Sequence, residues 1–286
     1  MEAYEETFDF LNETFVRNIG TGKSDTFPII GRKRDAVEHV PGELILGGTV
    51  EHNETEIALD AMLIESAFIA EIDELMAHYP LSRPYARQIG ESLASVSNRR
   101  IGCALVNASR VTVPPYTGGP LPSYHWHANM RTDPAQLEEA AFKGVEHIRT
   151  HDIGGGTPTY WLPWQQQLLL ARYTGIDTVD SSGSGNRAAG TVGQIAGINV
   201  KGTNSVPKTL VDGTVDNRAK YQGDFTSTVG VISNRMAVGT LRRRGLRVTM
   251  DNQNDRLGTL LIGSKLEGHD KLRPECAFEV CTAERI

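Results

Sequence analysis

The sequence predicts a mixed α+β fold, with helices in the middle of the chain and strands towards its end. Apolar residues at helical spacing are frequent between residues 68 and 173, whereas short β-type runs dominate beyond residue 225. A Gly- and Pro-rich stretch, residues 111–131, separates two helical regions. There is neither an internal repeat nor a sustained β-α-β alternation, so the 286 residues are interpreted as one large domain or two modest ones.

Residues 1–22 are predicted to form a short, acidic, amphipathic helix. Phe8, Leu11, Phe15 and Ile19 recur at spacings of three and four residues, which places them on one helix face. Such a short helix is marginal alone and must dock on a surface. That surface is either its own domain or a neighbouring subunit.

Residues 25–60 are predicted to form a long β-hairpin. The segments DTFPII at 25–30 and ETEIAL at 54–59 have strand character. VPGE at 40–43 and LGGT at 46–49 supply turn residues between them. An extended two-stranded ribbon is barely stable by itself, so another part of the assembly is expected to hold it.

Two helices are predicted next, one over residues 68–79 and one that begins at Ser82. Ser82 is a favourable N-cap, and Pro84 lies in the first turn, where a missing N–H costs little. Continued apolar spacing towards Leu105 makes the second helix about 25 residues long.

The remaining chain is predicted to mix helices and strands. Asp133 followed by Pro134 begins a helix that extends towards His151, and another helix covers residues 164–173. Residues 181–185, SSGSG, are expected to form a flexible loop, and residues 257–266 fit either a helix or a strand. The predicted strands are residues 160–162, 194–200, 228–232, 238–241, 246–250 and 278–281.

Composition limits the function classes. The chain has no apolar run near the roughly 18 to 20 residues that cross a bilayer, and its acidic N-terminus lacks the features of a secretory signal, which favours a cytoplasmic origin. Cys103, Cys276 and Cys281 lack CxxC spacing and are interpreted as reduced structural thiols. A net charge of -6 argues against a surface devoted to nucleic acid.

The segment GTGKS at residues 20–24 partly matches a phosphate-binding loop. That motif needs a first glycine five residues before Gly22, where this chain has Arg17. It also needs a helix after the Lys-Ser pair, but a β pattern containing Pro28 follows. Nucleotide binding is therefore disfavoured, and the segment is interpreted as the joint between the N-terminal helix and the hairpin.

Other candidate sites are weak. The histidines with chelating spacing lack an HExxH motif and a third ligand, so no metal or other cofactor is expected. They are His125, His127, His147 and His151. Arg242 and Arg244, in the densest basic patch, are predicted to share one face of a strand and to serve a salt-bridged sheet or a subunit contact, with nucleic-acid contact as the alternative.

Six segments of the chain form a recognisable series. They are GKSDTFPIIGR at 22–32, VPGE at 40–43, EIDELMAHY at 71–79, QIGESLA at 88–94, RMAVGT at 235–240 and LRPECA at 272–277. In the same order, they resemble segments of the major capsid proteins of short-tailed, T7-like bacteriophages. The similarity spans residues 18–110 and 190–280, whereas residues 111–189 match poorly.

The resemblance implies the HK97-like capsid fold, with five parts. These are an N-arm (1–24), an extended loop (25–60), a peripheral domain with its spine helix (61–110), an axial domain (111–224) and strands that return to the peripheral sheet (225–286). It also implies hexamers and pentamers that tile an icosahedral shell around double-stranded DNA. No enzymatic activity or cofactor is implied, and scaffolding, portal and cement proteins are expected partners.

The resemblance places the protein in the virion, after assembly in the bacterial cytoplasm. An encapsulin-like cellular compartment and a nucleotide-binding enzyme are the alternatives. Removal of residues 1–22 is expected to impair shell formation while leaving a folded subunit. The residues expected at inter-subunit contacts are Phe8, Leu11, Phe15, Ile19, Lys23, Arg32, Lys33, Arg34, Glu43, Arg242 and Arg244.

Overall fold

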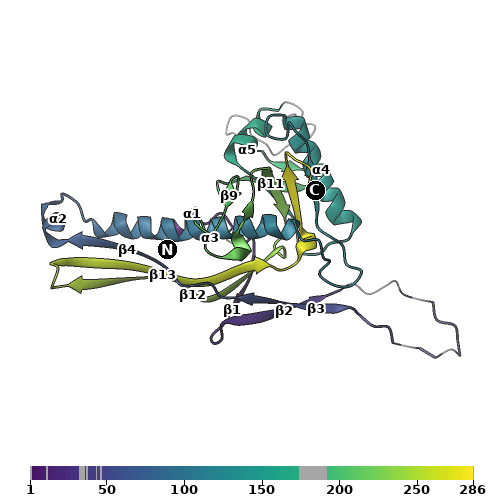
Figure 1. Cartoon of the computed structure of the whole chain (residues 1–286), viewed down its shortest axis with the longest axis horizontal. Helices are drawn as coiled ribbons and strands as arrows, with labels where there is room; N and C mark the ends of the chain where they lie inside the picture. Colours follow the sequence, from purple (N-terminus) through teal and green to yellow (C-terminus); the bar gives the residue numbers. More distant parts are fainter. Residues whose placement is uncertain are drawn as a thin grey trace.

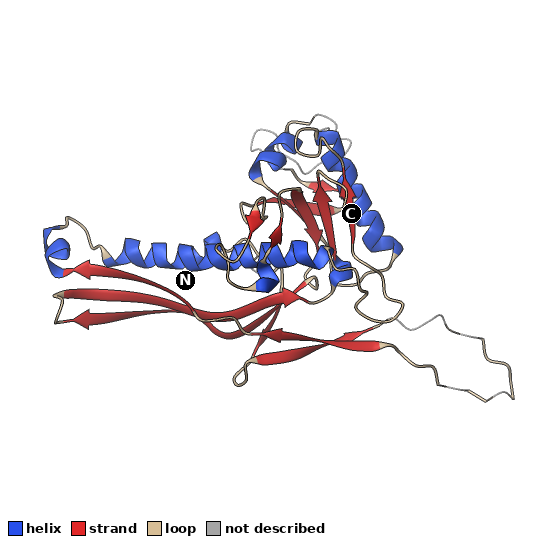
Figure 2. Cartoon of the chain, viewed as in Figure 1, coloured by secondary structure: helices blue, strands red, loops and turns tan. Residues whose placement is uncertain are grey.

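The computed structural model describes residues 2–10, 12–31, 36, 38–42, 44–45, 47–173 and 192–285. These residues form two larger sheets connected by one long helix, with a two-stranded hairpin beside them (Figures 1 and 2). One sheet forms an elongated lower lobe along the helix. The other lies in an upper lobe with shorter helices around it.

The lower lobe is built on a four-stranded sheet with the order β1-β12-β13-β4. Its two long strands are antiparallel neighbours, β12 (Val238–Gln253) and β13 (Gly258–Lys271). β4 (Leu63–Ala70) pairs antiparallel with β13, and β1 (Phe15–Asn18) pairs parallel with β12. Residues 257–266, ambiguous by sequence, therefore belong mainly to a strand.

The long helix α3 (Ser82–Ser109) has 28 residues and confirms the predicted spine helix. It lies along the four-stranded sheet, where Ile89 and Leu93 pack against Ile69 and Leu261. The helix is about 42 Å long at 1.5 Å per residue. The predicted cap is wrong, because Leu81 is the N-cap residue and its side chain forms no capping hydrogen bond.

The upper lobe contains a six-stranded sheet with the order β5-β14-β11-β6-β8-β7. Its strands are β5 (Ser123–Trp126), β6 (Thr159–Leu162), β7 (Gln194–Ile195), β8 (Ile198–Gly202), β11 (Thr228–Ser233) and β14 (Ala277–Cys281). Two helices of this lobe, α4 (Pro134–Thr150) and α5 (Trp164–Ala171), follow the predictions. The Asp133 side chain accepts a hydrogen bond from the Ala135 N–H, which confirms the predicted cap.

The sheet assignment of residues 225–286 is corrected by this topology. They were predicted to return to the peripheral sheet, but only β12 and β13 join the four-stranded sheet. β11 pairs with β6 and β14 instead, so these two C-terminal strands complete the upper sheet. Backbone pairing with β6, which lies far earlier in the sequence, decides their position.

The predicted helix over residues 1–22 is also wrong. Helix α1 covers only Glu2–Thr7, and Asn12 has a positive φ of 64°, which is incompatible with a continuous right-handed helix. The chain then enters β1, and the Ile19 N–H donates to the Arg242 carbonyl. Pairing with β12 prevails over the helical spacing of the apolar residues.

The hairpin prediction is confirmed, and the helix prediction that follows it is corrected. β2 (Ser24–Ile30) pairs antiparallel with β3 (His52–Ala58). Phe68 and Ile69 belong to β4, so helix α2 covers only Glu71–Met76. The predicted loop at 181–185 lies outside the described residues. Minor elements are β9 (Leu210–Val211), β10 (Gly223–Asp224), η2 (Ala219–Tyr221) and η3 (Pro274–Cys276).

Candidate assembly surfaces

The base of the hairpin is held by apolar packing. Along β2, side chains alternate, and Phe27 and Ile29 are buried whereas their neighbours are not. Phe27 and Ile57 form a core cluster with Leu241 of β12 and with Leu272. The hairpin root therefore lies against the four-stranded sheet, as Figure 1 shows.

Among its described residues, the distal part of the hairpin has no comparable core. Leu44 is 84% exposed and Ile45 is 78% exposed, and Val40 and Val50 are also exposed. In Figure 1 this part extends away from both lobes. A cluster of exposed apolar side chains on a projecting segment is typical of a protein–protein contact.

One face of the four-stranded sheet also exposes apolar side chains. Cross-strand register places Phe68 opposite Leu260, while Ile262 and Ile64 follow at alternate positions on the same face. The hairpin root crosses this same face, since a Cβ on Gly268 would lie 2.1 Å from the Ala58 carbonyl oxygen. We call it the hairpin-side face. Helix α3 covers the opposite face.

Two arginines lie on the hairpin-side face, but Arg242 does not. Arg244 pairs with Leu266 and Arg247 pairs with Ser264, two positions of that face. Register shifts on both sides of Arg244 place Arg242 opposite Glu267, with the Arg242 Nε 2.5 Å from the Glu267 Oε1. The prediction that Arg242 and Arg244 share a face is therefore wrong, because a bulge interrupts the alternation.

A second apolar cluster lies at the far end of the lower lobe. Ile72, Leu75, Met76 and Tyr79 repeat at helical spacing, and each is at least 64% exposed. Helix α2 buries none of its residues. The described chain therefore offers apolar contact surface at both of its extremities.

A buried carboxylate holds the root of the hairpin. The Asp60 side chain is 1% exposed and lies 2.7 Å from the Lys220 Nζ and 3.4 Å from the Arg100 Nη1. The Tyr221 hydroxyl donates to the Asp60 Oδ2 at 2.6 Å. Because an unpaired buried charge is costly, these partners fix the hairpin root to α3 and to the 216–221 segment.

A buried lysine holds the N-terminal segment. Lys265 of β13 is 1% exposed, and its ammonium donates to the Tyr4 hydroxyl and to the Ser97 Oγ. It also lies 2.8 Å from the Glu267 Oε2 and 4.8 Å from the centre of the Phe8 ring. Burial lowers the pKa of Lys265, while Glu267 opposes that change. The N-terminal segment is thus part of its own subunit's core.

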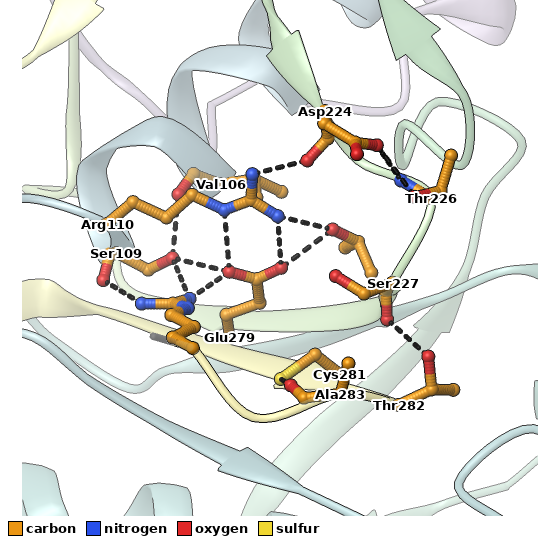
Figure 3. A network of polar contacts seen from close by, with 12 residues as sticks. Val106, Ser109, Arg110, Asp224, Thr226, Ser227, Glu279, Cys281, Thr282 and Ala283 are labelled. Atoms are coloured by element: carbon orange, nitrogen blue, oxygen red, sulfur yellow. Dashed lines mark hydrogen bonds and ion pairs between the residues drawn. The ribbon is translucent and has the colours of Figure 1, made fainter. Parts of the chain in front are cut away.

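A third buried charge lies between the end of α3 and strand β14, and Figure 3 shows its network of polar contacts. The Glu279 side chain on β14 is 0% exposed and accepts hydrogen bonds from Arg110 at the end of α3, at 2.8 and 3.0 Å. Arg285 donates to the same carboxylate and, at 2.7 Å, to the Ser109 carbonyl. Burial, reinforced by the Arg110 charge, lowers the pKa of Arg285 to about 10.

Comparison with known proteins identifies the family. A family model described as Gp10A-like major capsid protein matches residues 26–281. The chain belongs to the Gp10A-like major capsid protein family. The major capsid protein of Enterobacteria phage T3 is 26% identical over an alignment of 309 positions, gaps included, that covers 97% of this chain and 87% of the T3 protein.

Solved capsid structures share the fold. A chain of the cyanophage P-SCSP1u capsid superimposes with a TM-score of 0.80 at 29% identity, covering 95% of this chain and 87% of that chain. The mature capsid of bacteriophage PhiM1 gives a TM-score of 0.76 at 17% identity, covering 97% and 87%. This Gp10A-like chain therefore has the HK97-like capsid fold that the sequence resemblance implied.

The expected contact residues of this Gp10A-like protein lie in different environments. Phe8 is only 6% exposed, while Phe15 and Ile19 pack on the cluster at the hairpin root, so these three side chains contact their own subunit. Lys23 is exposed. Leu11, Arg32, Lys33, Arg34 and Glu43 lie outside the described residues.

The GTGKS segment connects β1 to β2. The Lys23 carbonyl accepts from the Leu59 N–H at 2.8 Å, and the Gly22 carbonyl accepts from Arg243 at 2.9 Å. A strand follows the segment, so its backbone lacks the helix N-terminus that binds phosphate in nucleotide-binding loops. It is the joint between the N-terminal segment and the hairpin.

The histidines and helices of the described chain give no other site. His125, His147 and His151 line one surface cavity of about 270 Å³, but no three His, Cys, Asp or Glu side chains gather there or elsewhere in the described ranges in a metal-binding arrangement. Within those ranges no helix is long and apolar enough to span a bilayer.

Sequence reasoning missed the three buried charges. Local spacing singles out none of Asp60, Lys265 and Glu279, since their partners lie far away in the sequence. One signal was present at Glu279, because an acidic residue interrupts the apolar run AFEVC. A charge inside such a run predicts a buried, paired group.

Proposed function

We propose that this chain forms hexamers and pentamers that tile an icosahedral shell around a double-stranded DNA genome. In this proposal the extended loop, residues 25–60, lies across the hairpin-side face of the next subunit. The observation that carries it is the presence of two exposed apolar surfaces in one subunit, Leu44 with Ile45 on the loop and Phe68 with Ile64 on the sheet. Neither is covered by the described part of its own subunit.

Charge complementarity supports the same arrangement. Glu54 and Glu56 are exposed along β3, and Arg244 and Arg247 lie on the hairpin-side face without an ion-pair partner among the described residues. Opposite charges of this kind favour the correct orientation and accelerate encounter more than they add affinity. Repetition around a closed shell then converts weak pairwise contacts into a stable assembly.

Further partners and the place of assembly follow from the same proposal. Scaffolding, portal and cement proteins would contact the shell, and assembly would take place in the cytoplasm of the host. No catalytic role is assigned, since the matched relatives are structural capsid proteins by name. The acidic balance of the chain fits a container that does not bind its DNA tightly.

The test is the double variant Leu44→Ser/Ile45→Ser, examined by negative-stain microscopy and sedimentation. Because each buried aliphatic side chain contributes about 1.5–3 kcal/mol, we expect shells to need at least about tenfold more subunit than the wild type. The matched control is Val113→Ser, a residue that is 68% exposed and lies outside the loop. Wild-type assembly by the double variant would contradict the proposed contact.

The contents of purified particles test the rest of the proposal. Particles that contain the phage genome support the shell function. Particles that enclose a protein cargo instead would indicate the alternative, an encapsulin-like compartment with the same fold.

A further inference from the structure

The extended loop contacts its own subunit at two places that are well separated along the hairpin. We propose that these two contacts orient the loop before assembly, and that Asn53 and Tyr116 are positioning residues for shell formation. The inference rests on the proposed role of the loop in subunit contacts. It adds that the loop direction is fixed in the free subunit.

The first contact is the hairpin root. Asp60 is held by Arg100, Lys220 and Tyr221, as described above, and the Asp60 N–H donates to the Glu267 carbonyl at 3.2 Å. The backbone at Ala58 lies so close to β13 that only a residue without a Cβ fits at position 268. The root therefore cannot slide along the sheet.

The second contact lies at the other end of the β2–β3 ladder. The Asn53 Nδ2 donates to the Pro115 carbonyl at 2.8 Å. The Tyr116 ring lies against Gly31, where a Cβ would be 2.9 Å from the ring atom Cδ2. Its other neighbour is Gly119, where a Cβ would be 3.1 Å from Cζ. The half-buried Tyr116 ring thus lies between the hairpin and its own turn.

Two separated contacts define a direction, whereas one leaves the hairpin free to rotate about its root. The paired strands span Ser24–Ile30 and His52–Ala58, so the contacts are about 20 Å apart at 3.4 Å per residue. A loop that already points in its bound direction loses less conformational freedom on docking. The support at residues 114–116 therefore favours assembly without touching the neighbouring subunit.

The experiment measures loop direction in free full-length subunits at a concentration below that of assembly. Nitroxide labels at Leu44→Cys and Ser95→Cys report the distance from the loop to helix α3 by pulsed electron resonance. The native Cys103, Cys276 and Cys281 are buried and are expected to stay unlabelled. We expect a narrow distance distribution in the wild-type background and a broad one in Asn53→Ala/Tyr116→Ala.

Three further variants separate orientation from folding. Thr117→Ala, an exposed control in the same turn, should keep the narrow distribution, and Tyr116→Phe, which retains the ring, should restore it when Asn53 is intact. All variants should keep one cooperative urea transition, which shows that they fold, and the double variant should lose only the stability of one net hydrogen bond, on the order of fivefold in the unfolding equilibrium constant. In unlabelled chains, Asn53→Ala/Tyr116→Ala should raise the subunit concentration for half-maximal shell formation on the order of fivefold, the ratio expected for one net hydrogen bond.

The measured distance distributions test the inference separately from the proposed function. A narrow distribution in the double variant, or a broad one in the wild type, would overturn the inference while leaving the proposed shell function untouched. A third outcome is that the wild-type chain shows the narrow distribution, and the double variant the broad one, while the wild type forms no shells. That result would support the orienting contacts and contradict the proposed function.

Discussion

Burial, followed by nearby cations, lowers the pKa of His269 and favours its neutral form in the folded subunit, although the Glu267 carboxylate lies 3.9 Å from its Nε2. Its Nδ1 lies 2.9 Å from the Thr240 hydroxyl, and burial followed by the charges of Lys265, Lys220 and Arg100 holds its pKa well below 6.5. In the unfolded chain the imidazole takes up a proton near pH 6.5, whereas in the folded chain it does not. Stability contributed by this group is therefore lost as the pH falls below about 6.5.

We predict that His269→Gln weakens the acid destabilisation of the subunit. The wild type should lose up to about 1.4 kcal/mol of unfolding free energy per pH unit below 6.5 from this one group, until the folded pKa is reached. Urea titrations at pH 7.5, 6.5 and 5.5 measure the slope. Burial lowers the pKa of His125 and His147 as well, so the variant should retain part of the loss of unfolding free energy at low pH. An unchanged slope would contradict the buried, neutral assignment of His269.

The residues that hold the fold were largely invisible in the sequence. Asp60 and Arg100 are 40 positions apart, and Arg100 and its second partner Asp216 are 116 apart. Nothing in local spacing indicates that these charges meet, because tertiary packing alone brings them together. The contact role of the extended loop, in contrast, could be predicted from the sequence, since a hairpin pattern without a core predicts an external partner.

At the scale of elements, the sequence predicted best where local chemistry agrees with the tertiary structure. The β2–β3 hairpin and the Asp133 cap formed as expected, because turn residues and a capping side chain act locally. The helix prediction for the N-terminal segment is wrong. The spacing of Phe8 and Phe15 fits a helix, but the backbone from Phe15 onwards pairs with β12. The predicted helix at Phe68 is wrong for the same reason, because the backbone of Phe68 pairs with strand β13.

Removal of residues 1–22 should destabilise the subunit, contrary to the expectation from sequence. The truncation deletes β1 and takes the buried Tyr4, Phe8 and Phe10 out of the core, and it removes one partner of the buried Lys265. Loss of a single buried Phe costs about 3–5 kcal/mol, so a marginally stable domain should melt at a much lower temperature. Thermal melting followed by circular dichroism measures this. A truncated chain with the melting temperature of the full chain would show that the segment adds no stability.

At the scale of the whole molecule, the Glu279 network joins the lobe of the long helix to the lobe of the six-stranded sheet. We predict that Glu279→Gln lowers the unfolding free energy by about 3–5 kcal/mol, because two arginines lose their buried partner. The control is Glu146→Gln, which breaks an exposed pair with Lys143 at 3.1 Å and should cost less than about 1 kcal/mol. Urea denaturation compares the two. Equal, small losses would show that the network does not connect the lobes energetically.

The division into two lobes could be predicted only in outline. The Gly- and Pro-rich stretch at 111–131 marks the passage from the long helix to the upper lobe, but nothing in the strands after residue 225 reveals which sheet each one joins. β11 and β12 are consecutive strands, yet they enter different sheets. Their assignment depends on distant pairing partners, which a single sequence does not display.

The contact between Tyr4 and Lys265 spans 261 residues of sequence, and this has a consequence for the timing of synthesis. While a chain emerges from the ribosome, Tyr4 lacks this partner until strand β13 has been made. Contacts of such long range form late and slow folding. The N-terminal segment therefore completes the subunit only after β13 has been made, so shorter nascent chains on polysomes should carry an unfinished core, and shells should grow from chains that contain both segments.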